Sequence, residues 1–246
     1  MPDRPRFSVI ITTYDRQHLL LEAIDSVLGQ TVQDLELIVV DDASPSAATV
    51  PSDSRVRLIR LQQNGGVGQS RNVGLAAARG KFIAFLDDDD VYEPDRLCVP
   101  DVPLSVCHRR DDYGITLFGR WAQQSPQIGQ VTIRRELCPP FDPAFARTED
   151  VDWWLTVTQI LAPSIVERVG VTHRSGAPHQ LTSVTRPHDL VSGVLRLLNK
   201  HPEYFSSHRA AAALQWNRAW HWSRRTGHPL AALVYKVRAL RAAHRL

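Results

Sequence analysis

Long apolar runs are missing from this sequence of 246 residues, and no stretch approaches the roughly 18 consecutive apolar residues of a membrane-spanning helix. The opening residues, MPDRPRFSVIITTYD, contain neither the hydrophobic region nor the cleavage site of a signal peptide, and they lead directly into an apolar run. Both absences argue against an integral membrane protein or a secreted precursor. We therefore expect a cytoplasmic protein.

Cysteine is also scarce, since the chain contains only Cys98, Cys107 and Cys138. They form no CxxC pair and their number is odd, which fits reduced thiols better than a disulfide framework. Zinc-finger spacing and an aromatic-basic RNA-binding signature are absent too, and the formal net charge of +3 is small. We expect no nucleic-acid partner.

The first hundred residues alternate between short apolar runs and amphipathic runs of helical period. Helices are predicted over 16–29 and 67–79; the second begins after Gly65 and Gly66, and Gly80 is expected to end it in the left-handed conformation. Alternation at this spacing is typical of an α/β protein, with a parallel sheet between helices on both faces. The predicted strands cover residues 7–12, 35–40, 55–61 and 82–86.

The second half is less regular. Residues 98–130 show no sustained period, residues 130–134 resemble a strand, and residues 149–161 a helix in which Trp153 and Trp154 are partly buried. This Trp pair is more typical of a core than of a sugar-stacking platform. From about Pro187 the pattern is helical to the end. The last helix carries an apolar stripe made of Leu230, Leu233, Val234, Val237 and Leu240, with Lys236, Arg238 and Arg241 beside it.

Polar residues follow three of the predicted strands, at the ends where open α/β sheets bind their ligands. They are the segments 12–15 (TTYD), 41–42 (DD) and 87–90 (DDDD). An Asp after a strand is often a helix cap, which is an equally good explanation for Asp15 or Asp42 taken alone. Three polar strand ends together favour a ligand site.

The run Asp87 to Asp90 is the sharpest single feature. Adjacent carboxylates repel one another, and the repulsion grows as water is excluded, so a bound cation would explain the run. Carboxylates alternate sides in an extended segment, which would turn Asp87 and Asp89 to one side and Asp88 and Asp90 to the other. Mg²⁺ or Mn²⁺ suits such an all-oxygen site. A solvated acidic loop is the alternative.

Arg71 lies near the start of a predicted helix, where the helix dipole disfavours a cation. A nearby anion, such as a nucleotide phosphate or an aspartate of the site, would compensate; an ordinary surface ion pair is the alternative. The glycine-rich segment NGGVGQS adds little, because it lacks the Lys-Ser/Thr of a phosphate-binding P-loop.

In this order the segments VIITTYDR, QTVQDLELIVVDDAS, NGGVGQSRNVGLAAARGKFIAFLDDDD and EPDRL resemble the donor-binding half of family 2 glycosyltransferases. The resemblance covers residues 7–97 nearly continuously with specific motifs, and it resumes more loosely at VTIRREL, FDPAF and TEDVDWWL. It implies a GT-A fold, in which a Rossmann-like, mostly parallel sheet is flanked by helices. The implied domains are a catalytic domain over 1–186, with a donor half (1–97) and an acceptor half (98–186), and a helical extension over 187–246.

The resemblance also implies roles for single residues. Asp41 would accept a hydrogen bond from the base, and in the Asp-x-Asp motif Asp87 would lie towards the ribose and Asp89 on the metal. Relatives frequently have Asn at position 15, a difference that should matter little in a polar pocket. The implied nucleotide contacts are Thr12, Tyr14, Asp15, Asp41, Arg71, Asp87 and Asp88; the implied metal ligands are Asp89 and His173, with Mg²⁺ or Mn²⁺ as cofactor.

Relatives often carry a His or Arg near the diphosphate, and VTHRSGAPHQLT offers His173 and His179. The spacing is not a clean match, so either can be an ordinary loop residue. The pair Glu149 and Asp150 matches the acidic pair on the acceptor side of the family, and by that resemblance Asp150 is the catalytic base. Without it, helix capping would be the better explanation.

These roles imply an inverting glycosyltransferase that moves a sugar from a UDP, dTDP or GDP donor to a hydroxyl of a glycan, a lipid-linked sugar or a natural product. A sugar-1-phosphate nucleotidyltransferase normally has a glycine-rich, basic loop after its first strand, which VIITTYDRQHLL lacks. The presence of Asp87, Asp89 and Asp150 argues against a non-catalytic nucleotide-sugar binder, although such motifs can persist without activity. Acceptor contacts are expected from residues 98–130.

The Arg-rich amphipathic helix at the C-terminus has two interpretations. It can lie on a membrane surface, which would place the protein at the inner membrane face with a lipid-linked acceptor. It can instead pack on the catalytic domain and leave a basic face in solvent, which is the interpretation we favour from the sequence.

Overall fold

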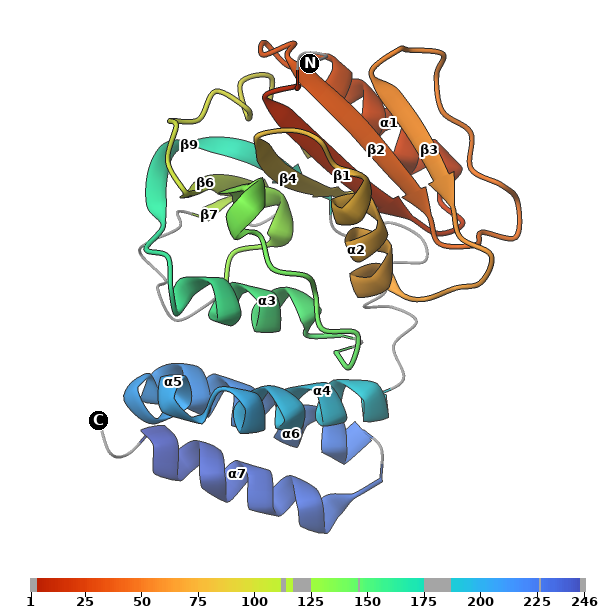
Figure 1. The fold of residues 1–246 in the computed structure, drawn as a ribbon. Coiled ribbons are helices and arrows are strands. Elements are labelled where there is room, and N and C mark those ends of the chain that lie inside the picture. Colours follow the sequence, from red (N-terminus) through yellow and green to blue (C-terminus); the bar gives the residue numbers. More distant parts are fainter. Residues whose placement is uncertain are drawn as a thin grey trace.

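The computed structural model describes residues 4–111, 114–116, 125–145, 147–174, 187–225 and 227–243. In these ranges a nine-stranded sheet carries helices on both faces, and the helices after residue 187 form a further layer beyond one end of the sheet (Figure 1). Within the same ranges, no helix has both the length and the apolar character needed to span a bilayer.

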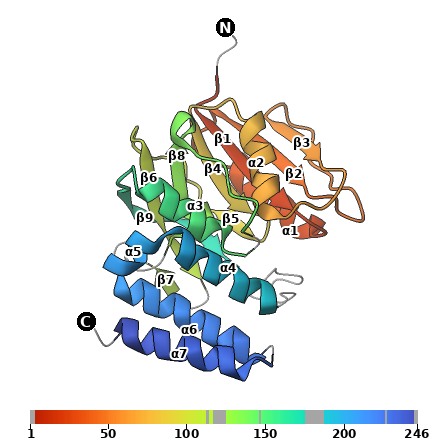
Figure 2. The same cartoon turned by 60° about the horizontal axis from the view of Figure 1, so that its bottom comes forward.

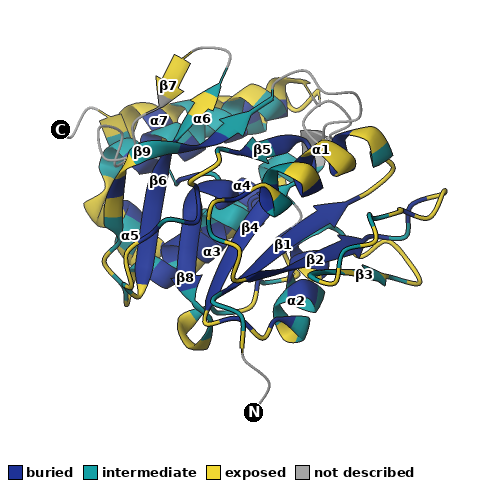
Figure 3. Ribbon diagram, turned by 90° about the horizontal axis from the view of Figure 1, so that it is seen from above, coloured by how far each residue is buried: buried dark blue, intermediate teal, exposed yellow. Residues whose placement is uncertain are grey.

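The first four strands form the parallel part of the sheet in the order β3-β2-β1-β4. All residues of β1 and β2 are buried, because their continuous apolar runs have a layer of structure on each side (Figure 3). Register places the carboxyl ends together, with Thr13 beside Asp41 and Thr12 beside Asp87. The bounds are β1 Phe7–Thr13, β2 Leu35–Asp41, β3 Val56–Arg60 and β4 Phe82–Asp87.

Helices α1 (Gln17–Leu28) and α2 (Val67–Ala77) cover opposite faces of these strands. The apolar side of α1 packs with Val9 and Ile11, whereas α2 lies on the face that carries Ile10. Contact with α2 is close, since a Cβ on Gly74 would come within 2.5 Å of the Ile10 side chain. These two helices therefore fix the strand ends between them.

The predicted left-handed end of α2 at Gly80 is wrong. The helix already stops at Ala77, Ala78 is extended with φ −71°, and Gly80 does not have a positive φ. A Cβ at residue 80 would lie 2.5 Å from the backbone nitrogen of Ser8. Glycine is needed there because two backbone segments approach closely.

The remaining strands extend the sheet from β4 in the order β8-β6-β9-β5, and β7 pairs with β6. The chain leaves β4 at Asp87, turns through Asp88 and Asp89, and enters β5 at Asp90, where it pairs with β9. The aspartate run is thus a tight connection between two distant positions of the sheet. The bounds are β5 Asp90–Tyr92, β6 Leu104–Asp111, β7 Gly114–Thr116, β8 Val131–Arg134 and β9 Ser164–His173, with single-turn helices η1 (Ile128–Gln130) and η2 (Arg135–Leu137) around β8.

Helix α3 (Glu149–Thr158) lies between the sheet and the C-terminal helices α4 (Pro187–Lys200), α5 (Pro202–Ser207), α6 (Arg209–Arg225) and α7 (Pro229–Ala243). One side of α3 packs into the sheet core through Trp153, which is 1% exposed and stacks on Phe141. Its other side meets the C-terminal layer in an apolar cluster that includes Leu155, Leu197 and Phe205 (Figure 2). The predicted domain boundary at residue 187 borders the undescribed residues 175–186 and stays a prediction.

A buried polar contact accompanies this packing. The carboxylate of Asp152 accepts hydrogen bonds from Nε2 of His201 at 2.7 Å and from Nζ of Lys200 at 2.8 Å. The side chains of Asp152 and His201 are 2% and 3% exposed. Burial of a carboxylate is tolerated here because both of its oxygens are paired.

Helix α7 departs from the expected packing. It packs on α6 through Ala232 and Ala239, each 2% exposed, and lies on the far side of α6 from the sheet (Figures 1 and 2). In the favoured interpretation, a helix packed on the catalytic domain with a basic face in solvent, the packing partner is therefore wrong, whereas Arg238 and Arg241 are exposed. The stripe itself is exposed: Leu230 80%, Leu233 61%, Val234 50%, Val237 40% and Leu240 46%.

The Asp152 contact gives a stability prediction. Asp152→Ala should lower the free energy of unfolding by about 2 kcal/mol, because His201 would lose a charge-assisted partner in a buried position. Asp142→Ala is the matched control: Asp142 also accepts from Lys200 at 2.8 Å but is 35% exposed, so the loss should stay below about 1 kcal/mol. Urea denaturation followed by fluorescence measures both, and equal losses would contradict the assignment.

Candidate functional site

A hollow of 170 Å³ opens at the carboxyl ends of β1 and β2, beside the first turn of α2. Its floor is the buried strand end at Thr12 and Thr13, and its rim is Tyr14, which is 44% exposed. The predicted strand-end ligand site therefore coincides with a real depression. The lining residues are Thr12, Thr13, Tyr14, Arg16, Asp42, Asn64, Gly66, Val67 and Ser70.

Asp42 holds one wall of this hollow. Its carboxylate accepts hydrogen bonds from the backbone nitrogens of Gly65 at 2.8 Å and Gly66 at 2.9 Å, directly before α2. Asp42 thus holds the loop directly before α2 and is not the N-cap of a helix, because the N-cap of α2 is Gly66, which has no side-chain capping bond. The hydroxyl of Ser70 is buried and has no hydrogen-bond partner in the described part of the chain, so it is available to a ligand in the hollow.

Asp41 is fully buried and fixes the neighbouring loop. It accepts hydrogen bonds from the backbone and hydroxyl of Ser44 at 2.9 and 2.5 Å and from the nitrogen of Ala48 at 3.1 Å. Burial acts to raise the pKa of Asp41, but these bonds and nearby Arg60 outweigh it and leave the pKa below its usual value. The carboxylate has no open face towards a base in this conformation, so its predicted base contact would require the 44–48 loop to move.

Asp15 lies on the exposed rim of the site, with φ +56°. Its backbone nitrogen donates to the hydroxyl of Ser44 at 2.9 Å, which joins the loops after β1 and β2. Asp and Asn tolerate this left-handed conformation better than other residues with a side chain. The requirement explains why the two would replace each other at this position.

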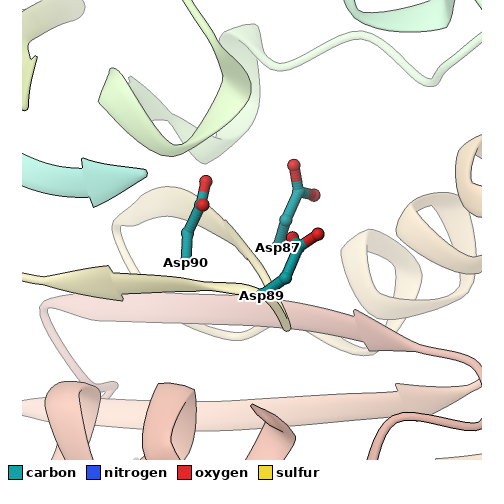
Figure 4. Close-up of side chains that lie close together, drawn as sticks. All are labelled: Asp87, Asp89 and Asp90. Carbon is teal, nitrogen blue, oxygen red and sulfur yellow. The ribbon is translucent and has the colours of Figure 1, made fainter. Parts of the chain in front are cut away.

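The aspartate run separates into two groups. Asp87, Asp89 and Asp90 each direct one oxygen to a common space, and these atoms lie within 4.8 Å of one another (Figure 4). Asp88 turns away and is fully buried. The predicted alternation is confirmed for Asp87, Asp88 and Asp89 and wrong for Asp90, because residues 88 and 89 form a turn that brings Asp90 to the side of Asp87.

Arg16 neutralises part of this charge and was not singled out from the sequence. Its guanidinium binds Asp88, with Nη2 to Oδ1 at 2.5 Å and Nε to Oδ2 at 3.2 Å, and its Nη1 reaches Asp89 at 2.9 Å. Burial raises the pKa of Asp88 to about 7 even though Arg16 opposes the rise. Asp88 therefore anchors Arg16 rather than facing the hollow.

The remaining three carboxylates fit a hard divalent cation. Each offers an oxygen, the ligand type that Mg²⁺ and Mn²⁺ take, and Asp87 is the most accessible, with 34% of its side chain exposed. His173 reaches the group through Asp90, since its Nδ1 lies 2.7 Å from Oδ1 of Asp90. That hydrogen bond raises the pKa of His173, while burial raises the pKa of Asp90. A direct metal contact from His173 stays a prediction.

Arg71 links the aspartate run to the start of α3. Its Nη2 lies 2.8 Å from Oδ1 of Asp87 and its Nη1 lies 3.1 Å from Oε1 of Glu149, with Phe141 stacked below the guanidinium at 5.3 Å. The side chain is only 5% exposed, which rules out the surface ion pair and leaves an aspartate of the site as its anion. Burial acts to lower the pKa of Arg71, but Asp87 and Glu149 raise it above its usual value.

Asp150 follows at the start of α3. Its carboxylate accepts a hydrogen bond from the nitrogen of Val151 at 2.8 Å, and it lines a cavity of 500 Å³. Burial raises the pKa of Asp150, and the charge of Asp87 adds to the rise, whereas Arg71 and Arg218 oppose it. A carboxylate of raised pKa beside a cavity is suited to accept a proton.

Comparisons with known proteins agree with this geometry. Residues 8–99 match the family model described as glycosyl transferase family 2. The succinoglycan biosynthesis protein ExoO of Rhizobium meliloti is 44% identical over 38% of this chain and 28% of its own length. The UDP-Glc:alpha-D-GlcNAc-diphosphoundecaprenol beta-1,3-glucosyltransferase WfgD of Escherichia coli is 30% identical over 61% of this chain and 68% of its own length. The chain belongs to glycosyl transferase family 2.

Solved structures confirm the GT-A fold for this family 2 chain. TarS 1-349 of S. aureus, solved in complex with UDP-GlcNAc, matches 96% of the chain and 79% of its own with a TM-score of 0.66 at 18% identity. The mannosyltransferase PcManGT from Pyrobaculum calidifontis, in complex with GDP-Man and Mn²⁺, matches 99% and 76% with a TM-score of 0.65 at 20% identity. The alignments with the first four curated relatives span only 26% to 39% of their lengths.

Most residues of the site are predictable from the sequence, but Arg16 and the acidic partners of the two arginines are not. Arg16 gave no signal except its place directly after the first polar strand end, and the pairing of Arg71 with Glu149 needs two segments that lie 78 residues apart. Trp153 belongs to the core, as its helical context indicated, and Trp154 is buried at 8% exposure. His179 lies outside the described residues.

The buried pair at the start of α3 gives a pH prediction. Burial raises the pKa of Glu149 to about 7 from an ordinary value of 4.5, so the folded state holds this proton more tightly than the unfolded chain does. Stability from this group is present below pH 4.5 and is lost as the pH rises through 7. Glu149→Gln should therefore gain roughly 1–3 kcal/mol in unfolding free energy, relative to the parent protein, between pH 5 and pH 8.

Urea titrations at a series of pH values measure this difference. The exposed Glu136→Gln is the control, and its difference from the parent protein should stay constant over the same range. A difference for Glu149→Gln that stays flat or falls with pH would show that Glu149 ionises normally in the folded state.

Proposed function

We propose that this family 2 chain transfers a sugar from a nucleotide-diphosphate donor to an acceptor hydroxyl. The observation that carries the proposal is the position of the three carboxylates Asp87, Asp89 and Asp90. They lie between the hollow at the strand ends and Asp150 at the start of α3. The relatives support it: structures of TarS hold UDP or UDP-GlcNAc, and that of PcManGT holds GDP-Man and Mn²⁺.

In this proposal the nucleoside occupies the hollow, with Thr12 and Tyr14 at its sides and Asp15 at its rim. The hydroxyl of Ser70, which has no hydrogen-bond partner among the described residues, offers one further polar contact. Arg71 acts on the nucleotide indirectly. It is buried, and it positions Asp87 rather than touching the nucleotide itself. UDP, dTDP and GDP donors are all compatible with these residues.

Asp89, Asp90 and Asp87 would hold Mg²⁺ or Mn²⁺, which when bound would offset the charge of the donor diphosphate. Arg16, already at Asp89, adds positive charge at the same place. This part of the site therefore favours departure of an anionic leaving group.

Asp150 is the proposed base. It takes the proton of the acceptor hydroxyl while that oxygen forms a bond to the anomeric carbon, and the bond from this carbon to the diphosphate breaks with its electron pair on the leaving group. Attack and departure on opposite sides of the carbon invert its configuration. The chain supplies orientation and charge, and no covalent intermediate is needed.

Two substitutions test the proposal in one set of measurements. Asp150→Asn should lower turnover by roughly a hundred- to ten-thousandfold while leaving Mn²⁺-dependent nucleotide binding intact, because only the base is lost. Asp89→Asn should weaken that binding instead. Calorimetric titration of UDP, dTDP and GDP, with Mn²⁺ or with EDTA, measures binding, and product formation measures turnover.

The exposed Asp25→Asn on α1 is the control and should change neither quantity. Unimpaired turnover in Asp150→Asn would remove Asp150 from the role of base. Metal-dependent binding without turnover in the parent protein would favour the non-catalytic nucleotide-sugar binder.

We also propose that α7 contacts an anionic membrane surface. Its exposed stripe of five aliphatic side chains lies on the outer face of the helical layer, and Arg238 and Arg241 are exposed around the same side. Residues 204–246 contain eight Lys and Arg and no Asp or Glu. An apolar stripe bordered by cations is the pattern of a helix that lies in the headgroup region of anionic lipids.

Vesicle binding tests this contact. The protein should sediment with vesicles that contain phosphatidylglycerol and much less with pure phosphatidylcholine, and Leu233→Ser combined with Val237→Ser should abolish sedimentation. Ile160→Ser is the control, since Ile160 is 75% exposed but lies at the end of α3. Absence of binding to anionic vesicles would refute the contact, as would a dimer in solution that the double substitution dissociates.

A further inference from the structure

The cavity beside Asp150 is formed by two parts of the chain that lie far apart in the sequence. The first turns of α3 form one wall, and α5 and α6 of the C-terminal layer form the other. Its volume of 500 Å³ lies within the roughly 300–1,000 Å³ of ordinary small-molecule sites. The lining residues are Ser125, Gln127, Arg147, Asp150, Val151, Trp154, Leu155, Tyr204, Phe205, Ala211, Leu214, Gln215 and Arg218.

Helix α6 turns one continuous face into this cavity. Ala211, Leu214, Gln215 and Arg218 are spaced by three and four residues, so they lie above one another on the helix. Ala211 and Leu214 complete the apolar wall, whereas Gln215 and Arg218 bring polar groups. Two functional side chains at adjacent positions of an otherwise apolar face indicate a ligand with polar groups.

Gln215 carries an unmet hydrogen-bond acceptor. The residue is 6% exposed, and its side-chain oxygen is buried with no donor in the described part of the chain. A buried amide oxygen without a partner is costly, and a ligand hydroxyl would relieve that cost.

Arg218 brings a positive charge to the cavity. It makes no hydrogen bond or ion pair with any described residue, and the charge it acts on is Asp150 in the same cavity. The other nearby acid, Glu149, is already paired with Arg71. A half-buried guanidinium directed into a cavity is suited to a phosphate, which it binds through two N–H groups at once.

We infer that this cavity receives the acceptor, that Gln215 and Arg218 of α6 determine its specificity, and that the acceptor is a sugar that carries a phosphate or diphosphate. The inference rests on the proposed function and adds the class of acceptor to it. Asp150 would face the attacking hydroxyl, Gln215 would accept from another hydroxyl, and Arg218 would bind the phosphate. The C-terminal helices thereby become part of the substrate site.

Binding of simple probes to the full chain tests this. Calorimetry in the presence of UDP and Mn²⁺ compares glucose 1-phosphate with methyl glucoside, and a polyprenyl diphosphate-linked sugar in detergent with the same detergent alone. The phosphorylated probes should bind at least tenfold more tightly than methyl glucoside. The soluble and lipid-linked probes separate a free sugar phosphate from a lipid-linked one.

Arg218→Gln should remove that preference by weakening the phosphorylated probe about ten- to hundredfold, with methyl glucoside and UDP unchanged. Arg218→Lys should restore part of it. Arg224→Gln is the control, because Arg224 is exposed at the end of the same helix. Gln215→Leu should weaken both sugars alike.

Equal binding of phosphorylated and unphosphorylated sugars by the parent protein would overturn the inference, and so would an undiminished preference in Arg218→Gln. The parent comparison decides the matter even if a variant fails to fold. UDP binding with Mn²⁺ is measured in separate titrations of the same proteins, so the proposed function can stand while the acceptor class is rejected.

Discussion

The pairing of buried carboxylates with two arginines is the interaction on which the rest of the site depends. Asp87 to Asp90 and the acidic pair of α3 meet at one edge of the sheet, where like charges would otherwise force the segments apart. Arg16 holds Asp88 and Asp89 from the β1 side, and Arg71 holds Asp87 and Glu149 from α2. Both cations come from segments that follow a parallel strand, so the fold delivers them to the place where the acids collect.

The acidic residues of the site therefore have different roles. Asp88 and Glu149 are buried and paired, and they hold the arginines in position. Asp87, with 34% of its side chain exposed, and the buried Asp89 and Asp90 each direct an oxygen to the common space, and Asp150 lines the cavity. Adjacent residues in sequence therefore have different environments, because a turn at 88–89 and the start of a helix at Glu149 send neighbouring side chains in different directions.

The sequence predicted the parallel strands and α1 to within a few residues, because continuous apolar runs and helical periodicity are local signals. It also predicted that the polar strand ends would meet. The predicted alternation of the aspartate side chains was wrong at Asp90. The tight turn at residue 88 depends on the pairing of β5 with β9, a partner some eighty residues away. The predicted packing partner of α7 was wrong for a similar reason. The stripe shows that one face is apolar, but it does not show that two alanines on the opposite face make the contact with α6.

Helix α7 is attached chiefly to one other helix, α6, at the outer side of the helical layer, and this has a consequence for the order in which the molecule loosens. Alanines let the two helices approach closely, and ring and cation contacts such as Trp216 with Tyr235 and Lys236 over Trp220 also join them. Helix α7 should therefore open as a unit of its own, well below the free energy at which the sheet unfolds. Its amide protons would exchange first, while the strands that carry the aspartates remain protected.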